Sequence, residues 1–141
     1  MTLGVDITHE AREAFDRLRK SRVTNYAIVL VPDVDTLKLN LETEYNEGIT
    51  LDDLALKLPQ DQPRFVVYMP ERVHPDGRKS YPLILISYCP PSLPPQVNIV
   101  YSNSRSELHK TFQVNHMWDI NRRLDLDDED LKEKFNTNKW D

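Results

Sequence analysis

Few residues of this chain could do covalent or metal chemistry. The sequence has one cysteine, Cys89, and four histidines, His9, His74, His109 and His116, whose spacing matches no metal-ligand pair. A nucleophilic Cys89 paired with a distant histidine would make a small hydrolase, but a free cysteine ending an apolar run is more commonly a buried packing residue. The chain also lacks a Gly-rich phosphate loop and a Gly-x-Ser-x-Gly elbow. We therefore expect no enzyme activity, no metal and no cofactor, with the Cys89 hydrolase as an alternative.

Basic and polar stretches are better candidates for function. A basic cluster at 17–22 ends an N-terminal helical pattern, and a basic stretch at 72–79 surrounds the turn sequence His-Pro-Asp-Gly. The third candidate is the polar side of a helical pattern at 94–112. Exposed arginines and amides on rigid elements suit contact with a macromolecule better than a small-substrate pocket. The sequence therefore favours a protein-binding module over an enzyme.

Composition limits the class of protein. The chain has 141 residues, 39% of them hydrophobic, a formal net charge of −5 and a pI near 5.4. That length suits one domain, and the charge lacks the basic excess typical of nucleic-acid binding. No apolar run approaches the roughly 18 residues of a membrane span. One cysteine allows no disulfide and fits a reducing, intracellular compartment. We expect neither nucleic acid nor a membrane span.

Hydrophobic periodicity predicts alternating helices and strands. Helical spacing covers 6–20, 50–58, 94–112 and the stretch from Asp127 onward, and strand patterns cover 26–31, 37–42, 64–68, 81–88 and 114–120. Asp6 or Thr8 would cap the first helix and Thr50 the second, and proline opens the third. Small hydroxyl residues at 102–104 predict a bend there. The order indicates an α/β chain of the α+β type, with a central five-stranded mixed sheet flanked on both faces by helices.

Four segments carry a resemblance to a known family. Leu18–Lys20 with Arg22, Pro63–Tyr68, Asp76–Leu83 and Ile99–Arg105 resemble the glia maturation factors, which have the actin-depolymerising-factor homology (ADF-H) fold. The resemblance spans residues 1–136 as a single ADF-H domain and leaves 137–141 as a short polar C-terminal tail. It implies binding to the actin-related protein 2/3 complex (the branch complex), debranching of actin filament networks and inhibition of branched nucleation, without catalysis or a cofactor.

A cofilin-like protein that binds and severs actin filaments is the alternative within this fold. Cofilins resemble Pro-x-Lys-x-Lys-Met-Ile-Tyr at the start of the long helix, where this chain has Pro-Gln-Val-Asn-Ile-Val-Tyr at 95–101. Gln96 and Asn98 therefore stand where cofilins carry lysines. A neutral amide does not replace a point charge against an acidic actin surface, so the amides favour the branch complex as the partner.

The resemblance also implies two binding surfaces. The primary surface comprises Thr2, Leu3, Gly4, Arg19, Arg22, Gln96, Asn98, Ile99, Ser102, Arg105, Asn121 and Arg122. The second surface, expected against the first actin subunit of the daughter filament, comprises Arg72, His74, Asp76, Arg78, Lys79, Lys132 and Glu133. The implied protein is a cytoplasmic monomer at branched-actin structures, such as cortical patches or the cell cortex, with the nucleus as an alternative location. By analogy with cofilin-like proteins, phosphate on Thr2 would add charge at the binding end.

Overall fold

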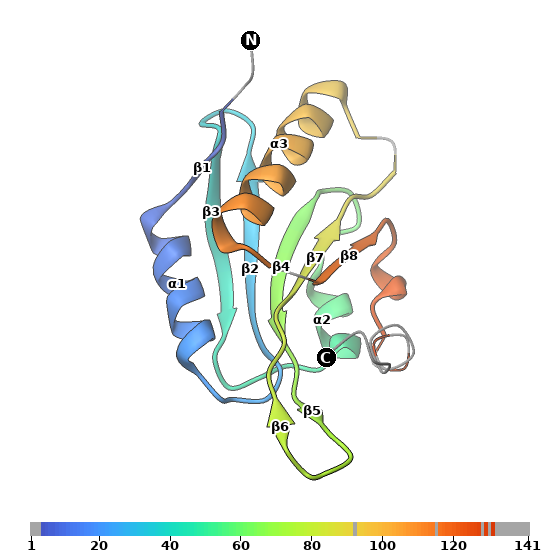
Figure 1. Cartoon of the computed structure of the whole chain (residues 1–141). Coiled ribbons are helices and arrows are strands. Elements are labelled where there is room, and N and C mark those ends of the chain that lie inside the picture. The colour runs from blue at the N-terminus through green and yellow to red at the C-terminus, as the bar shows by residue number, and fades with distance from the viewer. Residues whose placement is uncertain (1–3, 92, 115, 128, 130, 132–141) are drawn as a thin grey trace.

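A mixed sheet forms the centre of the computed structural model, which describes residues 4–91, 93–114, 116–127, 129 and 131 (Figure 1). Its six strands run in the order β1-β3-β2-β4-β7-β8. The strands are β1 (Asp6–Ile7), β2 (Tyr26–Asp33), β3 (Lys38–Tyr45), β4 (Arg64–Met69), β7 (Ile84–Tyr88) and β8 (His116–Ile120). The helices are α1 (His9–Lys20), α2 (Leu51–Lys57), α3 (Pro95–Phe112) and a 3-10 turn, η1 (Arg123–Asp125). A separate hairpin pairs β5 (Arg72–Val73) with β6 (Lys79–Ser80).

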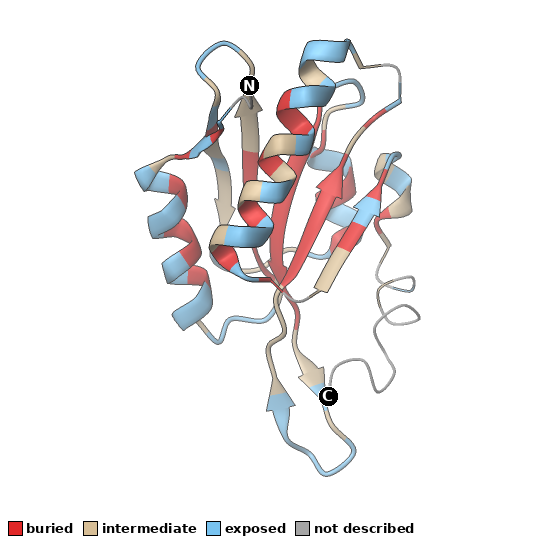
Figure 2. Ribbon diagram, turned by 45° about the horizontal axis from the view of Figure 1, so that its top comes forward, coloured by how far each residue is buried: buried red, intermediate tan, exposed pale blue. Residues whose placement is uncertain are grey.

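Helices cover both faces of the sheet, as the sequence predicts (Figures 1 and 2). The buried side chains of α1 and α3 share one core, in which the rings of Phe15 and Phe112 stack with centroids 3.9 Å apart. On the other face, α2 contributes Leu51 and Leu54 to a second core. Buried residues, red in Figure 2, line the central strands and the sheet-facing sides of the helices. The sheet therefore fixes α1 and α3 side by side on one face.

Thr8 and Thr50 cap α1 and α2, as predicted for one of the two candidates at the first helix and for the second helix, although α1 begins at His9 and not at residue 6. The Thr8 hydroxyl accepts a hydrogen bond from the amide of Ala11 at 3.2 Å, and the Thr50 hydroxyl accepts one from Asp53 at the same distance. These bonds satisfy backbone donors that have no partner within a first helical turn. The long helix α3 begins one residue after its predicted start and ends at Phe112 as predicted. The Ser104 hydroxyl donates to the Val100 carbonyl at 2.7 Å, the contact expected of a bend, while the bend itself remains a prediction.

The predicted five-stranded sheet is wrong by one strand. Residues 6–7, predicted as the start of a helix, instead form β1, which pairs in parallel with Lys38 and Leu39 of β3. The strand predicted over 81–88 begins only at Ile84, and Pro82 has no amide hydrogen to give to a ladder. The stretch 72–79, predicted as a loop, holds the β5–β6 hairpin around its predicted turn. The terminal helix predicted from Asp127 lies largely outside the described residues.

Gly48 occupies a position that other residues would strain. Its φ is +95°, and a Cβ built there would overlap the carbonyl oxygen of Thr24. We expect Gly48→Ala to lower the free energy of unfolding by about 1–3 kcal/mol, because both the backbone conformation and the space disfavour a side chain. Urea unfolding measures this. Gly4→Ala is the control, since its Cβ would meet no atom within 4 Å, and equal stability of the two variants would contradict the prediction.

A charged network joins α1 to the sheet. The Arg17 guanidinium donates two hydrogen bonds to the Glu44 carboxylate, at 2.9 and 2.7 Å, and the Tyr26 hydroxyl donates a third. The hydrogen bonds from Arg17 are the main cause that holds the pKa of Glu44 below its ordinary value. Burial, followed by the bond to Glu44, raises the pKa of Tyr26 to about 12. The network therefore favours an ionised Glu44 and a neutral Tyr26 in the folded state.

Acid should weaken this network. Because the folded pKa of Glu44 lies below its unfolded value, its contribution to stability is present at neutral pH and is lost as the pH falls below about 5. We expect Glu44→Gln to be less stable than the wild type at pH 7, and to lose less stability between pH 7 and pH 3. Urea unfolding at several pH values measures both. The exposed Glu47→Gln is the control, and an identical pH dependence of Glu44→Gln and wild type would contradict the prediction.

Candidate functional site

The first turn of α3 carries polar side chains, and two prolines define where the helix begins. Pro94 is the N-cap residue and Pro95 the first helical residue, and the amides of Val97 and Asn98 donate to the Pro94 carbonyl at 3.0 and 3.1 Å. Proline fits here because its fixed φ suits the helix and a first-turn amide has no helical partner. Gln96 is exposed in this turn. The opposite side of α3 buries Val100, Tyr101, Ser104, Leu108 and Phe112 against the sheet.

Five predicted residues share the outer side of α3. They are Gln96, Asn98, Ile99, Ser102 and Arg105, which we call the amide face. Ile99 is half-exposed, at 50%, and is the large apolar side chain of this face. Asn98 is exposed, but its amide donates to the Leu93 carbonyl at 3.3 Å and its oxygen accepts from the Cys89 thiol at 3.8 Å. Asn98 therefore braces the segment before α3 as well as facing solvent.

Arg105 has a partner that the sequence analysis missed. Its guanidinium forms a two-pronged ion pair with Asp119 of β8, through hydrogen bonds of 2.9 and 2.8 Å. The hydrogen bond to Asp119 raises the pKa of Arg105, so the arginine stays charged. The alternation of β8 carried a signal for this contact, because exposed Asp119 lies between buried Trp118 and Ile120. The pair fastens the amide face to the edge strand.

The segment after β8 lies against the same end of α3. Asn121 lines a cavity of about 280 Å³ together with Cys89, Tyr101 and Asp119. Arg122 is exposed and pairs with Asp125 at 3.2 Å. Asn98, Arg105 and Arg122 do not line this cavity, but each contacts a residue that does, namely Cys89, Asp119 and Asp125. That these residues form one binding surface stays a prediction. Gly4 is exposed, whereas Thr2 and Leu3 lie outside the described residues.

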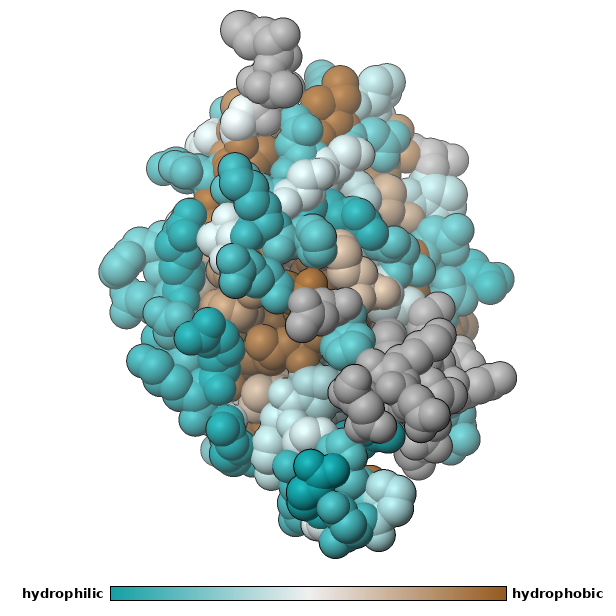
Figure 3. All heavy atoms as spheres, in the orientation of Figure 1, coloured by the Kyte–Doolittle hydropathy of each residue, from teal (hydrophilic) through white to brown (hydrophobic). Residues whose placement is uncertain are grey.

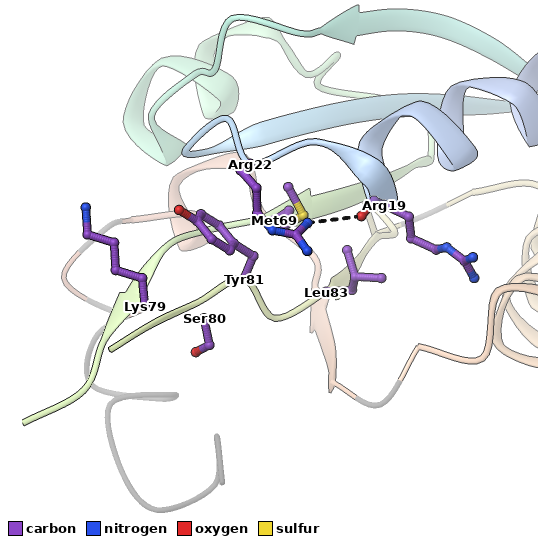
Figure 4. A pocket seen from close by; sticks show the side chains of 7 residues that line it. All are labelled: Arg19, Arg22, Met69, Lys79, Ser80, Tyr81 and Leu83. Atoms are coloured by element: carbon purple, nitrogen blue, oxygen red, sulfur yellow. Dashed lines mark hydrogen bonds between the residues drawn. The ribbon is translucent and has the colours of Figure 1, made fainter. Parts of the chain in front are cut away.

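Arg19 and Arg22 do not join the amide face. They lie at the C-terminal end of α1, near the point where the β5–β6 hairpin leaves the sheet, while α3 begins at the other end of the sheet (Figure 1). Both line a cavity with Lys79 and Tyr81 (Figure 4). The resemblance groups the two arginines with the amides, and the sequence does not reveal how α1 and α3 are oriented across the sheet. The predicted primary surface is therefore two separate surfaces in space.

The β5–β6 hairpin carries most of the predicted second surface. Its turn is closed by hydrogen bonds from His74 to Arg78, at 2.8 Å, and from Gly77 to His74, at 2.9 Å. Asp76 accepts from the backbone and side chain of Arg78 at 3.0 and 2.8 Å, and the backbone bond is the main cause that lowers the pKa of Asp76. Arg72 contacts His74 at 3.4 Å. Lys79 lies in β6, and Lys132 and Glu133 are outside the described residues.

Cys89 is poorly suited to nucleophilic catalysis. The residue directly follows β7 and is partly buried, and burial raises the pKa of its thiol. A catalytic cysteine needs the opposite shift, because the thiolate is the nucleophile. Within the described part of the chain, no three His, Cys, Asp or Glu side chains are placed to share a metal ion. None of the described helices is long and apolar enough to cross a bilayer.

Comparison with known proteins points to one family. A family model described as cofilin/tropomyosin-type actin-binding protein matches residues 4–136. The human protein glia maturation factor beta is 37% identical over 139 residues, which covers 96% of this chain and 97% of the relative. A glia maturation factor of Drosophila melanogaster is 32% identical over 131 residues, covering 92% and 94%. Both similarities extend over nearly the whole of each chain.

Solved structures agree with the fold. The solution structure of the glia maturation factor of Caenorhabditis elegans matches with a TM-score of 0.80 and 29% identity, over 95% of this chain and 97% of that one. The crystal structure of the Streptomyces griseoflavus cofilin matches with a TM-score of 0.77 and 18% identity, over 93% and 96%. The second likeness shows a shared fold only. The mixed sheet with helices on both faces is therefore the fold of this family.

Proposed function

This chain belongs to the cofilin/ADF-H family and, within it, to the glia maturation factors, and from that membership we propose that it binds the actin-related protein 2/3 complex. Binding would promote debranching of actin filament networks and inhibit branched nucleation. The protein would act as a cytoplasmic monomer at branched-actin structures, the cortical patches or cell cortex. Membership of this family indicates a role in regulating actin. The branch complex is the specific partner that we propose.

The amide face carries this proposal. In the first turn of α3, Gln96 and Asn98 are exposed and neutral, and Ile99 adds apolar surface beside them. A cofilin-like face would offer lysines at these two positions to an acidic actin surface. Neutral amides give hydrogen bonds without that long-range attraction. They support a partner that resembles actin in shape but differs from it in charge.

Debranching would need no covalent chemistry. A ligand that binds the branch complex more tightly when the daughter filament has left shifts the equilibrium toward dissociation by its differential affinity alone. The β5–β6 hairpin, with Asp76 and Arg78 at its exposed turn, is proposed to contact the first actin subunit of the daughter filament weakly. The amide face would then supply affinity, and the hairpin would bias which state of the branch is bound.

Removal of the two amides tests the proposal. We expect Gln96→Ala/Asn98→Ala to weaken binding to purified branch complex at least tenfold, because Gln96 is exposed to a partner and Asn98 holds the start of α3 in position. A pull-down measures binding, and imaging of pre-formed branches measures debranching. Ser106→Ala/Lys110→Ala is the matched control, since both residues are exposed on later turns of α3. Normal binding and debranching by the amide variant would reject the proposal.

Co-sedimentation with actin filaments separates the cofilin-like alternative. A glia maturation factor acting through the branch complex should remain in the supernatant with filaments alone. Strong pelleting of the wild-type protein with unbranched filaments would favour filament severing instead.

A further inference from the structure

A basic cavity lies between the end of α1 and the strand segment before β7. Its volume is about 300 Å³, and Arg19, Arg22 and Lys79 line it together with Tyr81. Figure 4 shows Arg22 between the Tyr81 ring and Met69, with Arg19 and Lys79 extending to either side. The cations come from two segments of the chain, residues 19–22 and β6, which the fold brings together. This cavity is remote from the amide face. The resemblance places its three cations in the expected binding surfaces, and the ligand inferred below is a different one from the branch complex.

The two arginines of the basic cavity are not neutralised by the protein. Among the described residues, five other arginines form ion pairs with carboxylates, whereas Arg19 and Arg22 form none. Arg22 donates to the Ser21 carbonyl at 2.9 Å and lies 5.5 Å from the centre of the Tyr81 ring. Arg19 lies 5.7 Å from the Phe15 ring. These cation–π contacts hold the two guanidinium groups near aromatic rings without a carboxylate that would neutralise their positive charge.

Neighbouring groups hold the cavity open in this shape. The Tyr81 hydroxyl donates to Glu71 at 3.3 Å, and Glu71 also accepts from Thr24 at 3.2 Å. Lys79 lies 3.9 Å from the same carboxylate. Glu71 therefore holds the Tyr81 ring in place and only partly neutralises the charge of Lys79. The ring that supports Arg22 is itself tied to the loop after β4.

Apolar surface continues from the cations. Buried Met69 and half-buried Leu83 line the cavity, and a second cavity of about 290 Å³ shares Ser80, Tyr81 and Leu83 with it. Val114 lines that second cavity. Figure 3 shows hydrophobic surface gathered in a hollow above the hairpin, framed by hydrophilic surface. A ligand here would meet cations at one end and apolar side chains beside them.

We propose that this groove binds an extended peptide that carries adjacent carboxylates followed by a large apolar side chain. The planar guanidinium groups of Arg19 and Arg22 match carboxylates through paired hydrogen bonds. The apolar side chain of the peptide would pack on Leu83. A phospholipid headgroup or a nucleic-acid phosphate could bind the arginines but would leave Leu83 uncovered. A net charge of −5 on the whole protein also repels such polyanionic surfaces at long range. A short acidic peptide uses both parts of the groove.

Fluorescence anisotropy with the full chain tests the proposal. The probe is a labelled peptide, Gly-Asp-Asp-Trp-Gly, and its neutral counterpart is Gly-Asn-Asn-Trp-Gly. We expect the acidic probe to bind at least tenfold more tightly than the neutral one, and Arg19→Gln/Arg22→Gln to weaken it at least tenfold. Lys38→Gln/Lys57→Gln removes the same charge from exposed positions outside the groove, and this variant should bind like the wild type.

Two further measurements separate this groove from general charge attraction. Backbone amide NMR shifts on adding the acidic probe should concentrate at Met69, Ser80, Tyr81 and Leu83, and spare the first turn of α3. Equal weakening by the two double variants would overturn the proposal, as would binding of vesicles rich in anionic lipid in preference to the peptide. Because no branch complex is present, these outcomes do not depend on the proposed function.

Discussion

Ile99→Asp is expected to weaken binding to the branch complex at least thirtyfold. Ile99 is the large apolar side chain at the centre of the amide face and is 50% exposed, so a partner can cover it. An aspartate there would lose the apolar contact and would have to shed its hydration in the interface. A loss of about 2 kcal/mol corresponds to the thirtyfold change. Competition binding with a labelled glia maturation factor and purified branch complex measures it.

The control for Ile99→Asp is Leu56→Asp. Leu56 is 68% exposed on α2, which packs on the other face of the sheet. The same change of chemistry at that position should leave binding to the branch complex unaltered. Equal affinity of Ile99→Asp and wild type, with both proteins folded by circular dichroism, would show that the partner does not contact the first turn of α3.

Phe112→Ala is expected to lower the free energy of unfolding by about 3–5 kcal/mol. The side chain is 7% exposed at the end of α3, and its ring stacks on Phe15 of α1. Truncation would remove apolar contacts and leave a cavity between the helices. Since domains of this size have only about 5–15 kcal/mol of stability, the variant would be close to unfolding. Urea unfolding followed by circular dichroism measures the change.

Phe112→Leu separates packing volume from ring stacking. Leucine keeps most of the buried volume, so we expect a loss of no more than about 2 kcal/mol. If alanine and leucine destabilised the protein equally, the stacked rings would be the main contribution of this position and the cavity argument would fail.

Local patterns predicted the long elements because their causes are local. The stripe of apolar residues and the threonine caps fixed α1 and α2, and proline at 94–95 marked the start of α3. The five predicted strands occur as β2, β3, β4, β7 and β8. By contrast, β1 is only two residues long and exists because Lys38 and Leu39 pair with it. Leu37 adopts a φ of 56°, a turn conformation that its residue type does not indicate.

The sequence predicts which candidate-site residues lie together on one helix. It does not predict which residues of different elements lie together in the folded protein. Helical spacing alone places Ile99 one turn from Gln96, at i,i+3, and Ser102 one turn from Asn98, at i,i+4. The resemblance groups Arg19 and Arg22 with the amides, and helical periodicity gives no information on which helix ends meet, so it could not show that the fold places them apart. Tyr81 was predicted as part of a strand, and its role beneath Arg22 depends on the hairpin that follows β4.

Asn98 and Arg105 hold the amide face in place before any partner arrives. Asn98 is hydrogen-bonded to the segment before α3, and Arg105 forms an ion pair with β8. Little side-chain conformational entropy therefore remains to be lost when a partner binds. A preorganised surface of this kind associates without a slow rearrangement, so variants and competing partners should differ chiefly in how long they stay bound.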